Sequence, residues 1–157
     1  MGKKPARGDN APEFRLPDDR EQLRTLKSYA GHKLVLYFYP NDDTSGCTRE
    51  AVDFSALKAE LHKADAAILG VSPDSPQSHD KFKSKHGLSI DLASDSSRDV
   101  CEAYGVWTEK SMYGRKFMGV ERTTFLIGRD GKIAEIWNKV RVPGHAEAVL
   151  TAVRALP

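Results

Sequence analysis

The chain has 157 residues, of which 39% are hydrophobic, so it can bury one core without disulfide bridges or a structural metal. Its 24 basic and 22 acidic residues nearly cancel, and the formal net charge of +2 gives no reason to expect nucleic acid or an anionic membrane as a partner. The basic opening MGKKPARG lacks the apolar core of a signal peptide. We therefore expect one domain over residues 1–157, with residues 1–8 as a flexible tail, in a soluble cytoplasmic protein.

The first part of the chain predicts strands followed by a helix. Two short stretches bounded by turn residues, 11–17 and 22–26, are typical of edge strands. The near-continuous apolar run KLVLYFY (33–39) predicts a central strand that is buried on both faces and ends at Pro40. Apolar residues then recur at helical spacing and predict a helix over 46–63.

The rest of the chain continues this alternation. The expected strands are 66–73 and 89–95, and the expected helices are 75–86, 97–105 and 143–156. The turn signal RDG between the apolar runs RTTFLIG and KIAEIWN predicts a β-hairpin. The pattern therefore favours an α/β fold in which helices flank a mixed central sheet.

Cys47 has surroundings that would make a thiol reactive. A thiol reacts as its thiolate, and the first turn of the helix expected at 46–63 offers unpaired N–H groups and the positive end of the helix dipole. Thr44 can place a hydroxyl beside the sulfur, and Gly46 lets a ligand approach the backbone closely. Pro40 has no N–H group and would present an apolar wall to the sulfur.

The spacing of Pro40, Thr44 and Cys47 in PNDDTSGC resembles the PxxxTxxC active-site motif of the peroxiredoxins. Further segments, including GDNAPEFRLP, ILGVSPDSPQSHDKFKSKHGL, LASDSSRDVCEAYGVW and RTTFLIGRDGKI, occur in the order expected for that family. The chain is most similar to the bacterioferritin comigratory protein, or peroxiredoxin Q, subgroup. This resemblance implies a thioredoxin-like fold and the reduction of hydrogen peroxide and alkyl hydroperoxides without a metal or organic cofactor.

The resemblance also implies a role for each matching residue. Cys47 would be the peroxidatic nucleophile, Thr44 would orient the peroxide, and Pro40 would shield the pocket. Arg122, just before the expected strand, matches the active-site arginine, whose permanent charge favours the thiolate. The backbone N–H groups of Gly46 and Cys47 would help to stabilise charge on the departing oxygen, leaving a sulfenic acid on Cys47.

The sequence departs from the family pattern where a second cysteine is expected. Proline is often found where this chain has Ser45, and many members carry a resolving cysteine at the position of Val52. Others carry it on the next helix, where KFKSKHGL has none. Cys101 is the only internal candidate, and its apolar surroundings favour a structural role.

We therefore expect a single-cysteine cycle in which thioredoxin, glutaredoxin or glutathione attacks the sulfenic acid, in a protein that is a monomer. A resolving role of Cys101 is the alternative cycle.

Two other functions stay open from the residues alone. A cysteine hydrolase would need a histidine base, for which His145 is available, and a noncatalytic peroxide sensor could use the same thiol. The five histidines are expected at the surface, and the acids at 42 and 43 are expected to solvate a loop or cap a helix. Aromatic residues at 107, 113 and 117 flank a glycine-containing loop that would either wall the pocket or pack.

Overall fold

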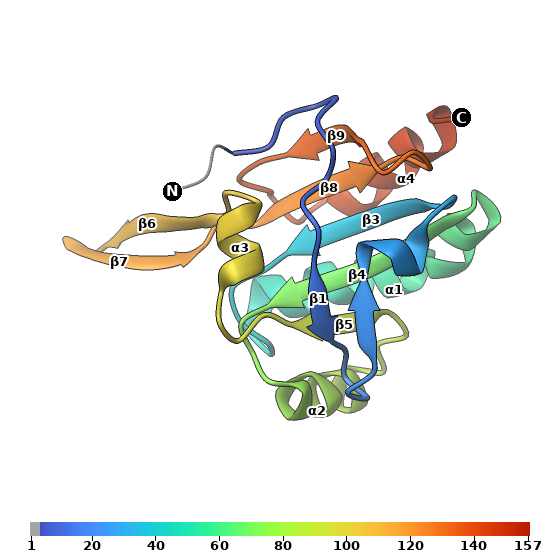
Figure 1. Cartoon of the computed structure of the whole chain (residues 1–157). Helices are drawn as coiled ribbons and strands as arrows, with labels where there is room; N and C mark the ends of the chain where they lie inside the picture. Colours follow the sequence, from blue (N-terminus) through green and yellow to red (C-terminus); the bar gives the residue numbers. More distant parts are fainter. Residues whose placement is uncertain (1–3) are drawn as a thin grey trace.

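The fold is built on a five-stranded sheet in the order β5-β4-β3-β8-β9, in a computed structural model that describes residues 4–157 (Figure 1). Strands β3 (Lys33–Phe38), β4 (Ala66–Ser72) and β5 (Asp91–Ser94) are parallel. Strand β8 (Thr123–Ile127) runs antiparallel to β3 and forms a hairpin with β9 (Ile133–Trp137). The predicted mixed sheet and the predicted hairpin at the RDG turn are confirmed.

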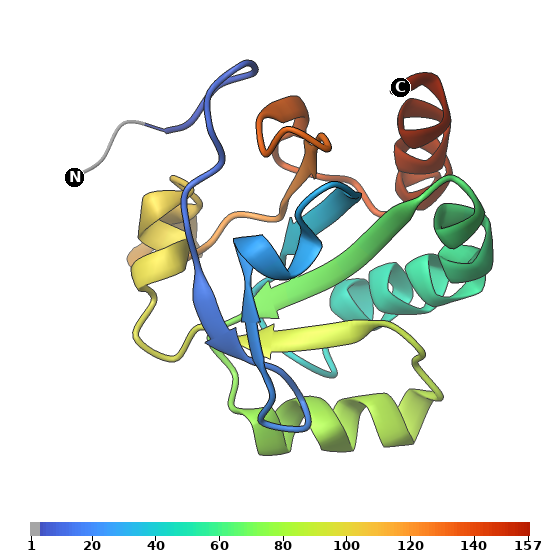
Figure 2. The same ribbon diagram turned by 45° about the vertical axis from the view of Figure 1, so that its right-hand side comes forward.

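Helices cover both faces of this sheet. One face carries α1 (Ser45–Lys63), α2 (Pro76–His86) and α4 (His145–Ala155), which Figure 2 shows on one side of the strands. The other face carries α3 (Asp99–Ala103) and the ribbon made by β1 and β2. Strand β1 is Arg15–Pro17 and strand β2 is Leu23–Thr25. A 3-10 helix, Leu26–Tyr29, follows them. Among the described residues, no helix is both long and apolar enough to cross a bilayer.

The central strand β3 divides the core into two parts. Its alternate residues Leu34, Leu36 and Phe38 pack with α3 and the β1–β2 ribbon. Val35 and Tyr37 pack with α1, α2 and α4 on the opposite face. All six residues of β3 are buried, because both faces of the sheet are covered. The apolar run at 33–39 predicted this double burial.

Helix α2 shows why its boundaries could be predicted. Pro76 occupies the first turn, where its missing N–H group is not needed, and the Ser78 N–H group donates to the Ser75 hydroxyl. Gly87 ends the helix with φ 62°, a left-handed conformation that suits glycine. These three signals agree with one another, so the helix begins and ends close to its expected limits.

The segment after α3, for which the sequence predicts a glycine-containing loop but no strands, forms a β-hairpin. Strand β6 (Trp107–Met112) pairs with β7 (Arg115–Val120), and the ribbon projects from the body of the molecule (Figure 1). Tyr113 and Gly114 have φ values of 53° and 76°, as in the type I′ turn that joins two-residue hairpins. Much of the ribbon is exposed, so its strands lack the apolar alternation by which a strand is recognised.

Part of the segment expected as a flexible tail packs against the body of the molecule. Residues 1–3 lie outside the described residues, but the chain is in contact with the body from Lys4 onward. Pro5 is buried, and the Gly8 N–H group donates to the Ile133 carbonyl at 2.8 Å. The Ile133 N–H group in turn donates to the Asp9 carbonyl at 2.9 Å, which places this segment beside the start of β9.

Candidate active site

The loop between β3 and α1 brings the motif residues to the start of a helix. Pro40 follows the end of β3, and Thr44 is the extended residue that precedes α1. The Thr44 hydroxyl donates to the Asn41 carbonyl at 3.1 Å, and its side chain makes no capping bond to the helix. Cys47 therefore lies in the first turn of α1, where the Thr44 side chain occupies none of the N–H groups.

Arg122 contacts the sulfur of Cys47 directly. Its Nη2 atom lies 3.2 Å from Cys47 Sγ, and its Nη1 atom donates to Glu50 Oε1 at 2.7 Å. Cys47 is 2% exposed and Glu50 is 1% exposed, so this guanidinium bridges two buried groups. A cation held against a thiol favours the thiolate, as does the helix start. The structure thus brings together two residues that are 75 positions apart in the sequence.

Gly46 allows the guanidinium to lie against the helix. A Cβ atom at this position would be 3.3 Å from Arg122 Nη2, which is closer than most contacts of real Cβ atoms. Any larger residue would push against the guanidinium. Gly46 thereby helps to set the distance between Arg122 and the sulfur.

The backbone of Arg122 is held between two pairs of strands. The residue lies in the short link between β7 and β8, and its carbonyl accepts from the Val140 N–H group at 3.0 Å. On the neighbouring strand β6, Lys110 is half-buried, and burial together with the Arg122 cation lowers its pKa. The side chains of Arg122 and Lys110 therefore place two cations around the same site.

Glu50 was not recognised from the sequence. Burial raises its pKa from 4.5 to about 7, against the lowering effect of Arg122. Burial by itself would lower the pKa of Arg122, but Glu50 and Cys47 outweigh it and raise that pKa. Among residues 4–157, neither Glu50 Oε2 nor the buried Tyr37 hydroxyl has a hydrogen-bond partner. The available signal for Glu50 was its spacing, one helical turn after Cys47 on the same face.

The second cysteine lies on the other side of the sheet. Cys101 is 0% exposed and packs in the core with α3, whereas Cys47 packs in the core with α1. The Cys101 N–H group donates to Asp95 Oδ2 at 2.7 Å, and burial together with this carboxylate raises the pKa of the Cys101 thiol well above its usual range. The central sheet separates the two thiols.

Two of the histidines expected at the surface are buried. His79 is 0% exposed, and His145 is 7% exposed. Burial and the Arg122 cation lower the pKa of His145 to about 4, and its Nε2 atom lies 2.8 Å from the Thr124 hydroxyl. His145 is therefore bonded to β8 through Thr124. Asp42, expected to solvate its loop or cap a helix, instead has a buried carboxylate next to His79.

The aromatic residues around the hairpin have different roles. Trp107 packs against the core on the α3 side and lies under the Arg98 guanidinium at 5.0 Å. Tyr113 is 97% exposed at the tip of the ribbon, and Phe117 is also exposed. The sequence left open whether these residues wall the pocket or pack. Trp107 packs, while Tyr113 faces solvent.

The architecture and the cysteine-centred site define a thioredoxin-like redox protein, and comparison with known proteins identifies the family. The model of the AhpC/TSA family matches residues 7–136. Peroxiredoxin Bcp of Xanthomonas campestris is 52% identical over 131 residues, which cover 83% of this chain and 82% of the relative. Peroxiredoxin Bcp of Bacillus subtilis is 45% identical over 145 residues, covering 92% of each chain. The chain therefore belongs to the AhpC/TSA family.

Solved structures agree with this assignment. A cysteine-to-serine variant of Xylella fastidiosa peroxiredoxin Q has a TM-score of 0.92 at 41% identity and covers 98% of each chain. A Xanthomonas campestris bacterioferritin comigratory protein, studied for its alkyl peroxide reduction activity, has a TM-score of 0.86 at 48% identity and covers 90% of each chain. The predicted thioredoxin-like fold is confirmed, and the chain is a thiol-dependent peroxidase of the peroxiredoxin type.

Proposed function

We propose that Cys47 is the peroxidatic nucleophile and reduces hydrogen peroxide and alkyl hydroperoxides. The observation that carries this proposal is the contact of 3.2 Å between Arg122 Nη2 and Cys47 Sγ at the start of α1. The thiolate attacks one peroxide oxygen, the O–O bond breaks, and the departing oxygen leaves as water or an alcohol once it takes up a proton. Cys47 becomes a sulfenic acid.

The neighbouring residues have distinct tasks in this step. Arg122 stabilises the thiolate and offers donors to the peroxide oxygens, and the N–H groups of Gly46 and Cys47 stabilise charge that develops on the departing oxygen. The Thr44 hydroxyl orients the peroxide after exchanging its bond to the Asn41 carbonyl. Pro40 limits the access of water at the entrance. The charge on the departing oxygen appears only during the reaction, so the two backbone donors act mainly on the transition state.

We propose that an external thiol completes the cycle. It attacks the sulfenic sulfur and releases water, and a second thiol then frees Cys47 by exchange. The positions of the two cysteines on opposite faces of the sheet support this single-cysteine cycle over a bridge between Cys47 and Cys101. Because Cys47 is 2% exposed, a bulky thiol reaches it only if the start of α1 moves.

Thioredoxin, glutaredoxin and glutathione are the candidate reductants, and the cycle suits the reducing thiol pool of the cytoplasm. We expect a monomer, because Cys47, Glu50 and Arg122 all come from one chain.

Mass spectrometry tests the proposal. The protein is treated with one equivalent of peroxide, the sulfenic acid is trapped with a dimedone-type reagent, and disulfides are mapped in the wild type and in Cys101→Ser. A trapped Cys47 without a bridge to Cys101 is expected in both proteins. A predominant 47–101 bridge in the wild type would contradict the single-cysteine cycle, and peroxidase activity in Cys47→Ser would contradict the assigned nucleophile.

A further inference from the structure

One carboxylate in the catalytic loop is buried although its neighbours are exposed. The side chain of Asp42 is 4% exposed, whereas Asn41, Asp43 and Thr44 are exposed. An ionised carboxylate that leaves water costs several kcal/mol unless hydrogen bonds and opposite charge replace its hydration. The loop thus contains one side chain whose burial requires specific partners.

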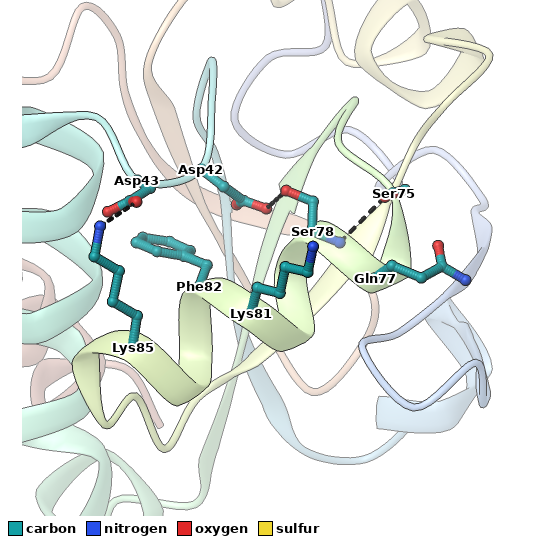
Figure 3. Close-up of a pocket in the computed structure, with 8 residues that line it drawn as sticks. All are labelled: Asp42, Asp43, Ser75, Gln77, Ser78, Lys81, Phe82 and Lys85. Carbon is teal, nitrogen blue, oxygen red and sulfur yellow. Dashed lines mark hydrogen bonds and ion pairs between the residues drawn. The ribbon is translucent and has the colours of Figure 1, made fainter.

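Three donors surround the Asp42 carboxylate. The Tyr39 hydroxyl donates to Oδ1 at 2.6 Å, and the Ser78 hydroxyl donates to Oδ2 at 2.7 Å. The Nδ1 atom of His79 lies 2.8 Å from the same Oδ2. Figure 3 shows Asp42 and Ser78 pointing toward each other across the gap between the loop and α2. These four residues, Tyr39, Asp42, Ser78 and His79, are here called the Asp42 clamp.

Both ring nitrogens of His79 have a hydrogen-bond partner. His79 Nε2 lies 2.9 Å from the Ala93 carbonyl, which can only accept, so Nε2 carries a hydrogen. Nδ1 faces a carboxylate oxygen of Asp42, which also requires a hydrogen between the two atoms. His79 is 0% exposed, so its bond to Asp42 is shielded from water. The ring connects the loop to β5.

The backbone of Asp42 is held as well. Its N–H group donates to Asp74 Oδ2 at 2.8 Å, and the Ser72 hydroxyl donates to that same oxygen at 2.7 Å. Beside these bonds, a cleft of about 500 Å³ separates the exposed part of the loop from α2 (Figure 3). Hydrogen bonds therefore tie Asp42 to α2 and to the loop that precedes this helix.

Asp42 lies between two motif residues along the chain. Asp42 comes two residues after Pro40 and two before Thr44, and Asp43 turns the backbone with φ 60°. Fixing Asp42 therefore fixes where α1 begins. We propose that Asp42, held by Ser78 and His79, is a positioning residue that sets the geometry of Pro40, Thr44 and the first turn of α1 for the peroxide step. This inference rests on the proposed role of Cys47.

Two rate constants of Cys47 test the inference. One is the reaction with hydrogen peroxide, and the other is alkylation by iodoacetamide at the same pH, which needs the thiolate but no oriented peroxide. For Asp42→Asn we expect the peroxide rate constant to fall by about 10- to 100-fold, the scale of loss for a small misplacement of reacting groups. Alkylation should stay within about threefold of the wild type, because Arg122 still contacts the sulfur. A loss in which both rates fall together would overturn the positioning role.

Asp43→Asn is the matched control in the same loop. Its carboxylate is 42% exposed and pairs with Lys85 and His86 at the surface. Such pairs contribute little, so its peroxide rate constant should stay within about twofold of the wild type. If Asp43→Asn loses as much rate as Asp42→Asn, or if Asp42→Asn is unchanged, the inference is wrong. Cys47→Ser distinguishes the two proposals, because activity in that variant contradicts the nucleophile itself.

Two further variants keep the test decisive if Asp42→Asn does not fold. Ser78→Ala removes one donor and no charge, and we expect a smaller peroxide-specific loss of about 3- to 10-fold. His79→Gln should lose peroxide rate, and the double variant Ser78→Ala/His79→Gln should lose less than the product of the two single losses, because both act through Asp42. Independent, multiplicative losses, or none in either variant, would rule out a shared clamp.

Discussion

The buried Glu50 carboxylate forms an ion pair of 2.7 Å with Arg122, and the second nitrogen of that guanidinium lies 3.2 Å from Cys47 Sγ. The Glu50 carboxylate therefore holds the Arg122 guanidinium in position against the sulfur. Because the three groups lie on two elements that are far apart in sequence, the arrangement exists only in the folded protein. Its energetic role can be tested one group at a time.

Replacing Arg122 by lysine should reduce the peroxide rate constant by about 100-fold or more, the scale for losing a transition-state donor. Lysine keeps the charge but cannot contact Glu50 and Cys47 with two fixed nitrogens. Stopped-flow measurement of sulfenic acid formation checks this. Arg115→Lys, on the exposed ribbon, is the control and should react like the wild type. If Arg122→Lys reacts with peroxide as fast as the wild type, the two fixed nitrogens of Arg122 are not needed for the reaction.

The ionisation of Glu50 should appear in the pH dependence of stability. Its pKa in the folded protein is raised from 4.5 to about 7, so its protonated form is favoured by folding. The stabilisation from protonated Glu50 is fully present below pH 4.5. The free energy of unfolding should therefore fall as the pH rises through 7. Urea unfolding between pH 4.5 and 8 measures this, and Glu50→Gln should lose that part of the dependence. An unchanged profile in Glu50→Gln would show that another group is responsible.

His145 should contribute with the opposite sign. Its pKa is lowered from 6.5 to about 4, so folding favours the neutral ring. The stabilisation from neutral His145 is fully present above pH 6.5 and is lost as the pH falls through 4. The loss in free energy of unfolding should be at most about 3 kcal/mol. Unfolding of His145→Gln should show a flatter profile over this range, whereas the exposed control His62→Gln should keep the wild-type fall. The same fall in both variants would exclude His145 as its source.

Removing the second thiol should leave the cycle intact. Cys101→Ala is expected to keep peroxide turnover with a thiol reductant within about twofold, while losing about 1 kcal/mol of stability because a buried atom is deleted. Steady-state assays and thermal unfolding measure the two effects separately. A loss of turnover at unchanged sulfenic acid formation would instead support Cys101 as the resolving cysteine.

Introducing a cysteine at Val52 should create an internal partner for Cys47. Val52 is 40% exposed on α1, five residues after Cys47. Peroxide treatment of Val52→Cys should give a 47–52 disulfide, detected by peptide mapping, provided that the first turns of α1 unwind. Ala59→Cys, about 18 Å along the same helix from Cys47, is the control and should form no bridge. Sulfenic acid without a bridge in Val52→Cys would show that the helix start stays closed.

The sequence by itself determined the elements that bury regular apolar patterns. The double-sided burial of β3, the limits of α2 and the β8–β9 hairpin follow from local residue types, and so does the position of Cys47 at a helix start. These features depend on spacing within one segment, which a sequence displays directly. The β6–β7 ribbon escaped detection because its exposed strands have no apolar alternation.

Only the tertiary structure decided which distant side chains meet. The orientation of the Arg122 side chain depends on Glu50 and on the link between β7 and β8. The burial of Asp42 depends on α2 and β5. The sequence left a resolving role of Cys101 open as the alternative cycle, and the fold places the two cysteines on opposite faces of the sheet. Contacts of this kind arise when separate elements pack together, and no local pattern encodes the distance between them.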